Sequence, residues 1–336
     1  MDVHVIGLGS SGSIAAISAL RNGYDVYVSE QMRRAGENTV CTGLISKETM
    51  EFLNRYIPTK RIVLQKIKKA VLHFGKSEIS IEHKDGAYIV DRKKMDFLLA
   101  EKAEREGAKI KFRDRMSKML QYKSKNIIGA DGANSIVAEH SGFPRIEKFA
   151  SAVVAKMHEK IVEKGSAHLY FNDYTKGFFS WVVDQGKMQE VGCGVILPNN
   201  VRCAFEKFAK SFGIKTKPEE SAVIPLRTRR KTGMRVDGKN VLLVGDAAGH
   251  VKAFSGGGVA YGLRIAELSA HYIEKPEEYD AAWKKKYGLV MAQFNFLQSV
   301  NELLPPGMAS FGAGMLKVFG VERFFENKKM DNPLGI

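Results

Sequence analysis

The chain has 336 residues, of which 44% are hydrophobic and 26% are charged, and its formal net charge is +15. This composition is that of a globular protein of about two domains, and no apolar run approaches the roughly 18 residues of a membrane-spanning helix. Three cysteines far apart in the chain and scattered histidines offer no ligand spacing for structural zinc. The sequence starts directly with a strand pattern, so we expect no signal peptide and a protein that is cytoplasmic or peripheral on a membrane.

Positive charge is concentrated in three short clusters, at residues 66–69, 227–231 and 284–286. Aromatic residues are not interleaved with these clusters, as they are on a surface that stacks nucleic-acid bases, so nucleic acid is a disfavoured partner. Two interpretations remain open. The clusters form either an ordinary solvated surface or a surface that meets an anionic membrane or an acidic redox partner.

Hydrophobic periodicity and turn residues predict an α/β fold that opens with a strand, a helix and a second strand. The helix is expected to end at Asn22-Gly23, because glycine tolerates the left-handed conformation found at helix ends. In chain order the expected elements are strand 3–6, helix 12–22, strand 25–30, short strands over 62–90, helix 91–106, strand 109–113, strand 126–132, an antiparallel sheet over 150–225, strand 241–246, helix 258–273 and helical segments over 277–330.

The turn between the first strand and the first helix carries the motif GxGxxG at residues 7–12. Gly7 permits the tight turn, Gly9 lets a pyrophosphate approach the backbone, and Gly12 lets helix and strand pack closely. The helix N-terminus then offers free N–H groups to the phosphates. Glu30, at the end of the second strand, is the expected partner of the ribose hydroxyls and disfavours a 2′-phosphate. The motif therefore predicts a dinucleotide site.

A downstream segment favours FAD over NAD as the dinucleotide. Asp246 follows the strand at residues 241–246, where its carboxylate can accept hydrogen bonds from ribitol hydroxyls. Residues 256–258 are three glycines that open the next helix, so backbone N–H groups can face the flavin pyrimidine edge, where negative charge develops on reduction.

These elements predict three regions. A discontinuous, Rossmann-like FAD-binding domain comprises residues 1–60, 88–150 and 236–275. An antiparallel-sheet, substrate-binding β domain comprises residues 61–87 and 151–235. A short C-terminal helical region comprises residues 276–336.

Several motifs resemble those of the p-hydroxybenzoate hydroxylase-like flavoproteins. Residues 129–135 (GADGANS) and 245–249 (GDAAG) are similar to the two aspartate motifs of that superfamily, and residues 90–96 resemble its arginine-bearing segment. Within the superfamily the chain resembles the geranylgeranyl reductase family, especially its archaeal members. The motifs that carry this likeness are CTGLIS at 41–46, the run at 245–258, and GFFSW at 177–181 followed by VGCG at 191–194.

The resemblance covers roughly residues 1–275 and departs from the family pattern in two places. Val182-Val183-Asp184 stands where the family usually has Phe-Pro after the tryptophan, and the C-terminal region is shorter. By position, the resemblance implies flavin contacts at Gly7, Gly9, Ser11, Gly12, Glu30, Cys41, Gly43, Arg92, Met116, Asp246, Gly257, Gly258 and Val259.

Some of these positions have a structural as well as a functional interpretation. Asp131 and Gly132 either contact the cofactor or form a structural turn. Cys41 is a small residue packed beside the flavin, a group that places substrate or supplies a proton, or, least favoured, half of a redox disulfide. Phe179, Trp181 and Val183 alternate and so share one sheet face, which is either core or the lining of an apolar substrate pocket.

The resemblance implies an FAD-dependent oxidoreductase that reduces C=C bonds in geranylgeranyl and related isoprenoid chains of membrane lipids. Reduced FAD would deliver hydride from N5 to one alkene carbon, and an acid or water would protonate the other. The sequence singles out no proton donor. The expected electron donor is a ferredoxin, a reduced nicotinamide or a deazaflavin.

Two other hypotheses stay open at this stage. One is an aromatic monooxygenase of the same fold, which would consume NAD(P)H and dioxygen with a phenol. The other is a non-enzymatic module that uses its basic surface to bind nucleic acid or a membrane. Contact with a membrane could come from an apolar C-terminal set, whose alternative is an ordinary helical core: Phe294, Phe296, Met308, Phe311, Met315 and Phe319.

Overall fold

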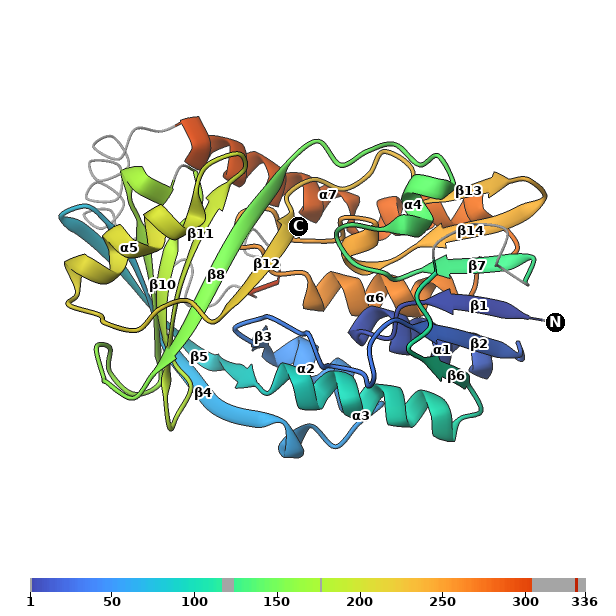
Figure 1. The fold of residues 1–336 in the computed structure, drawn as a ribbon, viewed down its shortest axis with the longest axis horizontal. Coiled ribbons are helices and arrows are strands. Elements are labelled where there is room, and N and C mark those ends of the chain that lie inside the picture. Colours follow the sequence, from blue (N-terminus) through green and yellow to red (C-terminus); the bar gives the residue numbers. More distant parts are fainter. Residues whose placement is uncertain (1, 117–123, 176, 304–329, 332–336) are drawn as a thin grey trace.

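The computed structural model describes residues 2–116, 124–175, 177–303 and 330–331. Within these residues the strands form a six-stranded sheet and an eight-stranded sheet, which lie at opposite ends of the molecule (Figure 1). The helices are α1 (Ser10–Arg21), α2 (Lys47–Leu53), α3 (Arg92–Arg105), α4 (Ile136–His140), α5 (Val201–Ser211), α6 (Val259–Ser269) and α7 (Pro276–Leu303), with 3-10 turns at Thr59–Arg61, Asp173–Thr175 and Gly245–Ala247.

The first sheet is a Rossmann-type sheet in which all neighbours are parallel except β13 and β14. Its central strands are buried along their whole length, as expected when helices cover both faces. Val3 and Val5 pack with α1 on one face, whereas Ile127 and Leu243 pack with α4 on the other. From edge to edge its strands are β13 (Gly233–Val236), β14 (Lys239–Leu243), β7 (Asn126–Gly129), β1 (Val3–Ile6), β2 (Val26–Glu30) and β6 (Lys109–Phe112).

The second sheet is antiparallel except between β4 and β9, which run parallel. The sequence predicted short strands over 62–90 in an antiparallel sheet; instead β4 and β5 form one long antiparallel hairpin, and β4 also pairs in parallel with β9. The parallel pairing is possible because a long crossover that includes strands of the first sheet lies between β4 and β9 in the chain. In spatial order the strands are β12 (Glu220–Pro225), β8 (Phe149–Met157), β11 (Gln189–Ile196), β10 (Ser180–Asp184), β9 (Ser166–Phe171), β4 (Val63–Phe74), β5 (Ser77–Val90) and β3 (Leu44–Ser46).

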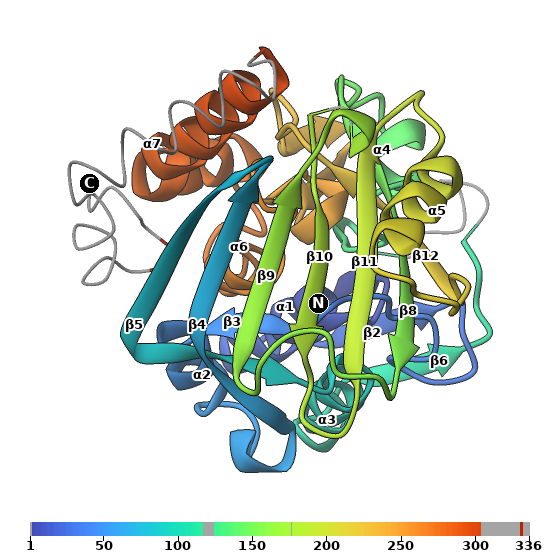
Figure 2. The same cartoon turned by 90° about the vertical axis from the view of Figure 1, so that its left-hand side faces the viewer.

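The two faces of the second sheet have different neighbours (Figure 2). On the outer face, Phe205 and Phe208 of α5 pack on Val182 and Val191 in one apolar cluster. The inner face points toward the first sheet and carries the aromatic residues of β10. The predicted α/β class, with a Rossmann-like sheet and a second, largely antiparallel sheet, is confirmed.

Helix α7 connects the two ends of the molecule. Trp283 and Phe294 belong to the core beneath the first sheet, while Gln298 and Asn301 each donate a 2.8 Å hydrogen bond to the carbonyl of Gly177 beside the second sheet. In the part of the chain that the structure describes, no helix is long and apolar enough to cross a membrane.

Candidate active site

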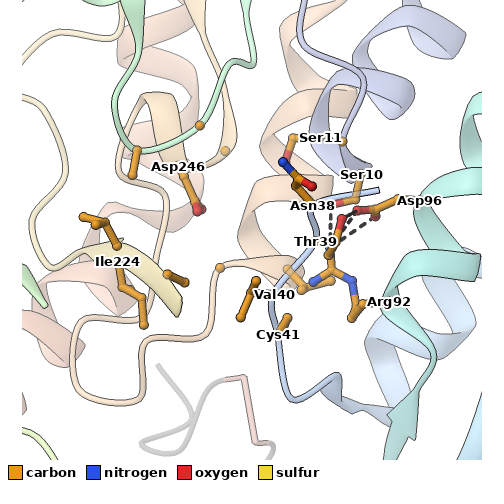
Figure 3. A pocket seen from close by; sticks show the side chains of 18 of the residues that line it. Ser10, Ser11, Asn38, Thr39, Val40, Cys41, Arg92, Asp96, Ile224 and Asp246 are labelled. Atoms are coloured by element: carbon orange, nitrogen blue, oxygen red, sulfur yellow. Dashed lines mark hydrogen bonds and ion pairs between the residues drawn. The ribbon is translucent and has the colours of Figure 1, made fainter. Parts of the chain in front are cut away.

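A cavity of about 820 Å³ lies between the two sheets, within the usual size range of ligand pockets. One end is formed by the turns that follow the first-sheet strands, and the other by the inner face of the second sheet (Figure 3). We call this space the site cavity. All the predicted cofactor and substrate residues except Gly12 line it: Gly7, Gly9, Ser11, Glu30, Cys41, Gly43, Arg92, Met116, Asp246, Gly257, Gly258, Val259, Phe179, Trp181 and Val183.

The three glycines of the first turn are required for different reasons. Gly7 has a φ of +96°, and a Cβ there would lie 2.4 Å from the carbonyl oxygen of Ala130. A Cβ on Gly12 would lie 2.0 Å from the carbonyl oxygen of Gly7, so this residue allows helix and strand to pack closely. A Cβ on Gly9 would meet no atom within 4 Å. Only the first two are explained by contacts within the protein.

The N-terminus of α1 is open to a ligand. Its N-cap is Gly9, which provides no side-chain hydrogen bond to the first turn. The first N–H groups of a helix need partners, and together with the helix dipole they favour an anion. Free space at Gly9 and an uncapped helix therefore fit a bound pyrophosphate.

Glu30 shapes this end of the cavity and also faces it. Its carboxylate accepts hydrogen bonds from the backbone N–H groups of Leu8 at 2.7 Å and Met32 at 2.8 Å. A carboxylate has about four acceptor positions, so capacity remains for ribose hydroxyls. The predicted ribose partner thus also ties the glycine turn to the end of β2.

Arg92 and Asp96 form an ion pair on the wall opposite Asp246 (Figure 3). Arg92 Nη2 donates to Asp96 Oδ1 at 3.2 Å and Ser10 Oγ at 3.4 Å, and Thr39 Oγ1 donates to Asp96 at 2.8 Å. Burial would lower the pKa of Arg92, but the Asp96 carboxylate outweighs it and raises the pKa. Arg92 Nε is buried without a protein partner, which leaves one donor for a ligand.

Asp246 follows β14, and its carboxylate points into the cavity (Figure 3). Burial raises its pKa, and the nearby Arg92 charge opposes that shift. A Cβ on Gly258 would lie 2.9 Å from Asp246 Oδ1, so glycine lets the carboxylate lie against the start of α6. That helix has Gly258 as its N-cap and no side-chain cap.

The segment that carries Cys41 runs along the cavity beside Arg92 (Figure 3). Cys41 is exposed and not part of a disulfide, and its Sγ accepts a 3.4 Å hydrogen bond from the N–H of Gly43. Gly43 has a φ of +78°, and a Cβ there would lie 2.2 Å from the carbonyl oxygen of Val90. The turn therefore holds the thiol in the cavity wall.

The remaining predicted residues have structural roles that the sequence left open. Asp131 accepts hydrogen bonds from Ser135 Oγ at 2.6 Å and from the N–H of Val137 at 3.0 Å, and so supports the start of α4. Asp131 and Gly132 nevertheless line the cavity, as does the buried Met116.

The apolar end of the cavity is an aromatic surface built on glycines. A Cβ on Gly192 would lie 2.2 Å from the ring of Trp181, and one on Gly194 would lie 2.3 Å from Phe178. The VGCG segment therefore lets these rings lie flat on β11. Phe179, Trp181 and Val183 are at once core residues and cavity lining, so the two interpretations of them are compatible.

Sequence reasoning missed Glu190, which lies immediately behind this surface. It is 2% exposed, and its carboxylate accepts hydrogen bonds from Thr42 Oγ1 at 2.5 Å, Trp181 Nε1 at 3.0 Å and Gln185 Nε2 at 2.9 Å. One signal was available in the sequence: Glu190 is two residues before Gly192 and so shares its face of a largely apolar strand. A buried acid is rare and often marks a functional site.

An open glycine turn after β1, an aspartate at the end of β14 and a second sheet closing the cavity form the arrangement that a flavin-dependent oxidoreductase needs. No family model matches the chain. Digeranylgeranylglycerophospholipid reductases of Methanococcus vannielii and Methanocaldococcus jannaschii are 24% and 26% identical to it, each alignment covering 90% of this chain and 87% of the relative. Over most of its length the chain is therefore similar to geranylgeranyl-type reductases.

A solved structure shows the same fold. It is that of a geranylgeranyl bacteriochlorophyll reductase-like protein from Thermoplasma acidophilum, with a TM-score of 0.74 and 20% identity over 96% of this chain and 90% of that one. Because the named relatives are reductases, the protein is an enzyme, and the fold that it shares with flavin-dependent enzymes fits a flavin cofactor. The aromatic monooxygenase hypothesis is less supported, because the named relatives in sequence are reductases, although a probable FAD-dependent monooxygenase shares the fold. The non-enzymatic hypothesis is not supported, because the protein is an enzyme.

Proposed function

We propose that the protein binds FAD in the site cavity and reduces C=C bonds of geranylgeranyl or related isoprenoid chains on membrane lipids. The observation that carries this proposal is a single cavity that joins an open glycine turn to an apolar aromatic surface. The names of the similar reductases support the substrate class.

When bound and reduced, FAD would supply the hydride. The first-sheet residues account for the binding of its parts: the open N-terminus of α1 for the pyrophosphate, Glu30 for the ribose and Asp246 for the ribitol. The uncapped start of α6 and residues 256–258 direct N–H groups toward the place where the flavin pyrimidine edge would gain negative charge.

The second sheet would hold the substrate by shape and burial. An isolated alkene has no polar group to bind, whereas burial of each CH₂ contributes about 0.8 kcal/mol. A phenol would instead require fixed hydrogen-bonding groups, since unpaired polar groups are costly to bury. The surface of Phe179, Trp181 and Val183, together with Val154 and Leu169, is apolar and suits an isoprenoid tail.

Electron supply and location belong to the same proposal. We propose a cytoplasmic enzyme, peripheral on a membrane, that receives electrons from a ferredoxin, a reduced nicotinamide or a deazaflavin. The net charge of +15 supports an anionic partner. Of the apolar C-terminal set, Phe294 is buried and Phe296 is 68% exposed, while Met308, Phe311, Met315 and Phe319 lie outside the described residues.

Heat release from one sample of the protein first identifies the bound cofactor. The test itself then compares two substrates, using samples that have not been heated. Chemically reduced, anaerobic protein is given a geranylgeranyl lipid, and a second sample is given a phenol with dioxygen. Flavin reoxidation by the lipid is the expected result; reoxidation only with dioxygen, with hydroxylated phenol as product, would reject the proposal. Trp181→Ala should lower lipid reduction while FAD content stays intact, and Trp283→Phe, which alters the tryptophan outside the cavity, controls for general loss of folding.

A further inference from the structure

Glu190 is a buried carboxyl group held by three polar groups at the boundary of the site cavity. Thr42 and Trp181, which both contact it, line the cavity, whereas Glu190 itself does not. Gln185 completes the arrangement, because its Nε2 donates to both Glu190 Oε2 at 2.9 Å and the carbonyl of Thr42 at 3.4 Å. The carboxyl group is therefore one side chain away from the space assigned to substrate.

The burial of Glu190 favours its neutral form. In the β-sheet register it lies opposite Val183 on β10 and opposite Lys156 on β8. Burial raises the pKa of Glu190; the hydrogen bonds from Thr42, Trp181 and Gln185 oppose that shift, as does the Lys156 charge, and the net direction is upward. A carboxyl group of raised pKa carries a proton at a pH where an exposed glutamate has lost it.

We propose that Glu190 is the proton source for alkene reduction and acts through the hydroxyl of Thr42, which touches the substrate. This inference rests on the proposed function and names the acid that its reaction needs. Thr42 is then the catalytic residue, because its hydroxyl touches the substrate. Glu190 acts through Thr42, since it supplies the proton that replaces the one Thr42 gives up.

The proton transfer is balanced. Bound, reduced FAD would supply the hydride for one alkene carbon; at the other carbon the O–H bond of Thr42 breaks and a C–H bond forms. The 2.5 Å contact joins Thr42 Oγ1 to an ionised Glu190 with Thr42 as donor; once Glu190 is protonated, its O–H donates to Thr42 Oγ1 instead, the Thr42 O–H turns to the alkene, and the proton of Glu190 passes to Thr42 in the same step. The resulting carboxylate keeps the hydrogen bonds from Trp181 and Gln185, and a proton from water restores the acid.

Three variants isolate the pieces of this relay. Glu190→Gln keeps the size of the side chain and removes the acid. Thr42→Val removes the hydroxyl, and Thr42→Ser restores it. Glu220→Gln is the matched control, because Glu220 lies on β12, is partly exposed and pairs with Lys93 outside the cavity.

The first measurement does not depend on turnover. Infrared spectra of the purified flavoprotein at neutral pH should contain a protonated-carboxyl C=O band that is lost in Glu190→Gln and retained in Glu220→Gln. A spectrum in which Glu190→Gln loses only carboxylate bands would show that Glu190 is ionised and would overturn the proposal.

The second measurement follows single-turnover reoxidation of the reduced enzyme by a geranylgeranyl lipid. Glu190→Gln and Thr42→Val should slow this step by roughly 10²- to 10⁴-fold, the usual contribution of a general acid, with lipid affinity little changed. The wild-type rate should fall as pH rises through the raised pKa of Glu190, and this dependence should vanish in Glu190→Gln. Thr42→Ser should restore most of the rate.

The experiments distinguish failure of the proton assignment from failure of the proposed function. Wild-type turnover with an unaltered rate and pH profile in Glu190→Gln would overturn the proton assignment alone. Loss of the pH dependence in Cys41→Ser, with Glu190→Gln normal, would assign the proton to the thiol and also overturn it. Reduced wild-type protein that no isoprenoid lipid reoxidises would overturn the proposed function, and the assignment with it.

Discussion

At the scale of single residues, Gly9 and Gly12 belong to one motif but serve different partners. The side of Gly12 faces the backbone of Gly7, so its requirement is internal to the fold. The side of Gly9 faces open space in the cavity, so nothing in the protein accounts for its small size. A ligand that approaches the backbone does account for it.

This difference predicts opposite effects of two similar substitutions. Gly9→Ala should change the free energy of unfolding of the FAD-free protein by no more than about 1 kcal/mol, because the new methyl group meets no atom. FAD affinity should nevertheless fall at least about tenfold, or about 1.4 kcal/mol, which titration followed by flavin fluorescence would measure.

Gly12→Ala is the control for this experiment. Its methyl group would lie 2.0 Å from the Gly7 carbonyl oxygen, so the FAD-free protein itself should be destabilised by about 1–3 kcal/mol, as is usual for overpacking. Equal FAD binding by wild type and Gly9→Ala would show that no phosphate lies against this turn.

At the scale of elements, the hairpin of β10 and β11 explains how a flat aromatic surface is made. Trp181 lies opposite Gly192 in the antiparallel register, and Phe178 packs on Gly194. Glycine normally weakens a strand, but here the missing side chains provide the space that the rings occupy. The rings in turn form the apolar end of the site cavity.

Gly192→Ala should therefore disturb both stability and the site. Its methyl group would lie 2.2 Å from the Trp181 ring, and displacing a rigid ring from a packed core costs about 1–3 kcal/mol. Urea unfolding should show the loss, and lipid reduction should fall with it. Adding Trp181→Phe should recover part of the stability, because the smaller ring leaves room; a double variant as unstable as the sum of both changes would contradict this packing.

At the scale of the whole molecule, Asp331 connects the end of the described chain to the site. Its carboxylate forms an ion pair with Lys252 Nζ at 2.8 Å and accepts hydrogen bonds from Ser46 Oγ at 2.5 Å and Thr49 Oγ1 at 2.9 Å. Lys252 and the neighbouring Met330 line the cavity. Burial would raise the pKa of Asp331, but Lys252, the Ser46 hydroxyl and the Arg264 charge outweigh burial and lower the pKa to about 2.

A lowered carboxyl pKa stabilises the folded state above the ordinary value of 3.8, and this stabilisation is lost as pH falls toward about 2. Asp331→Asn should therefore lower the free energy of unfolding by roughly 2 kcal/mol at pH 7. The difference between wild type and variant should close between pH 4 and pH 2, about the two pKa values of Asp331. Denaturant unfolding at several pH values measures it.

Asp85→Asn provides the comparison, because Asp85 pairs with Lys47 on the exposed surface, where ion pairs contribute about 0–1 kcal/mol. A pH-independent difference between wild type and Asp331→Asn would mean that the carboxylate charge does not stabilise this junction.

The overall charge of +15 predicts electrostatic attachment to membranes. The protein should sediment with anionic vesicles and be released by added salt, since exposed charges are screened over about 8 Å at physiological ionic strength. Vesicles of neutral lipid are the control. Equal binding to both kinds of vesicle at every salt concentration would reject the electrostatic contribution.

Much of the site could be predicted because its chemistry is encoded locally. A glycine turn between a buried strand and a helix, an acid at the next strand end and an aspartate before three glycines are each short-range patterns. The structure gathers these segments around one cavity because parallel strands of one sheet end at the same edge. Alternation likewise placed Phe179, Trp181 and Val183 on one face before their contacts were known.

Only the tertiary structure decided which distant residues meet. The parallel pairing of β4 with β9 joins segments about a hundred residues apart in sequence, and Thr42 and Glu190, which share a hydrogen bond, are 148 residues apart. No local pattern encodes such pairs, because they depend on how the two sheets close over the cavity. Turn residues and hydrophobic periodicity in the sequence determined the class of site. Tertiary packing decided which side chains surround the buried Glu190, because its partners come from distant segments.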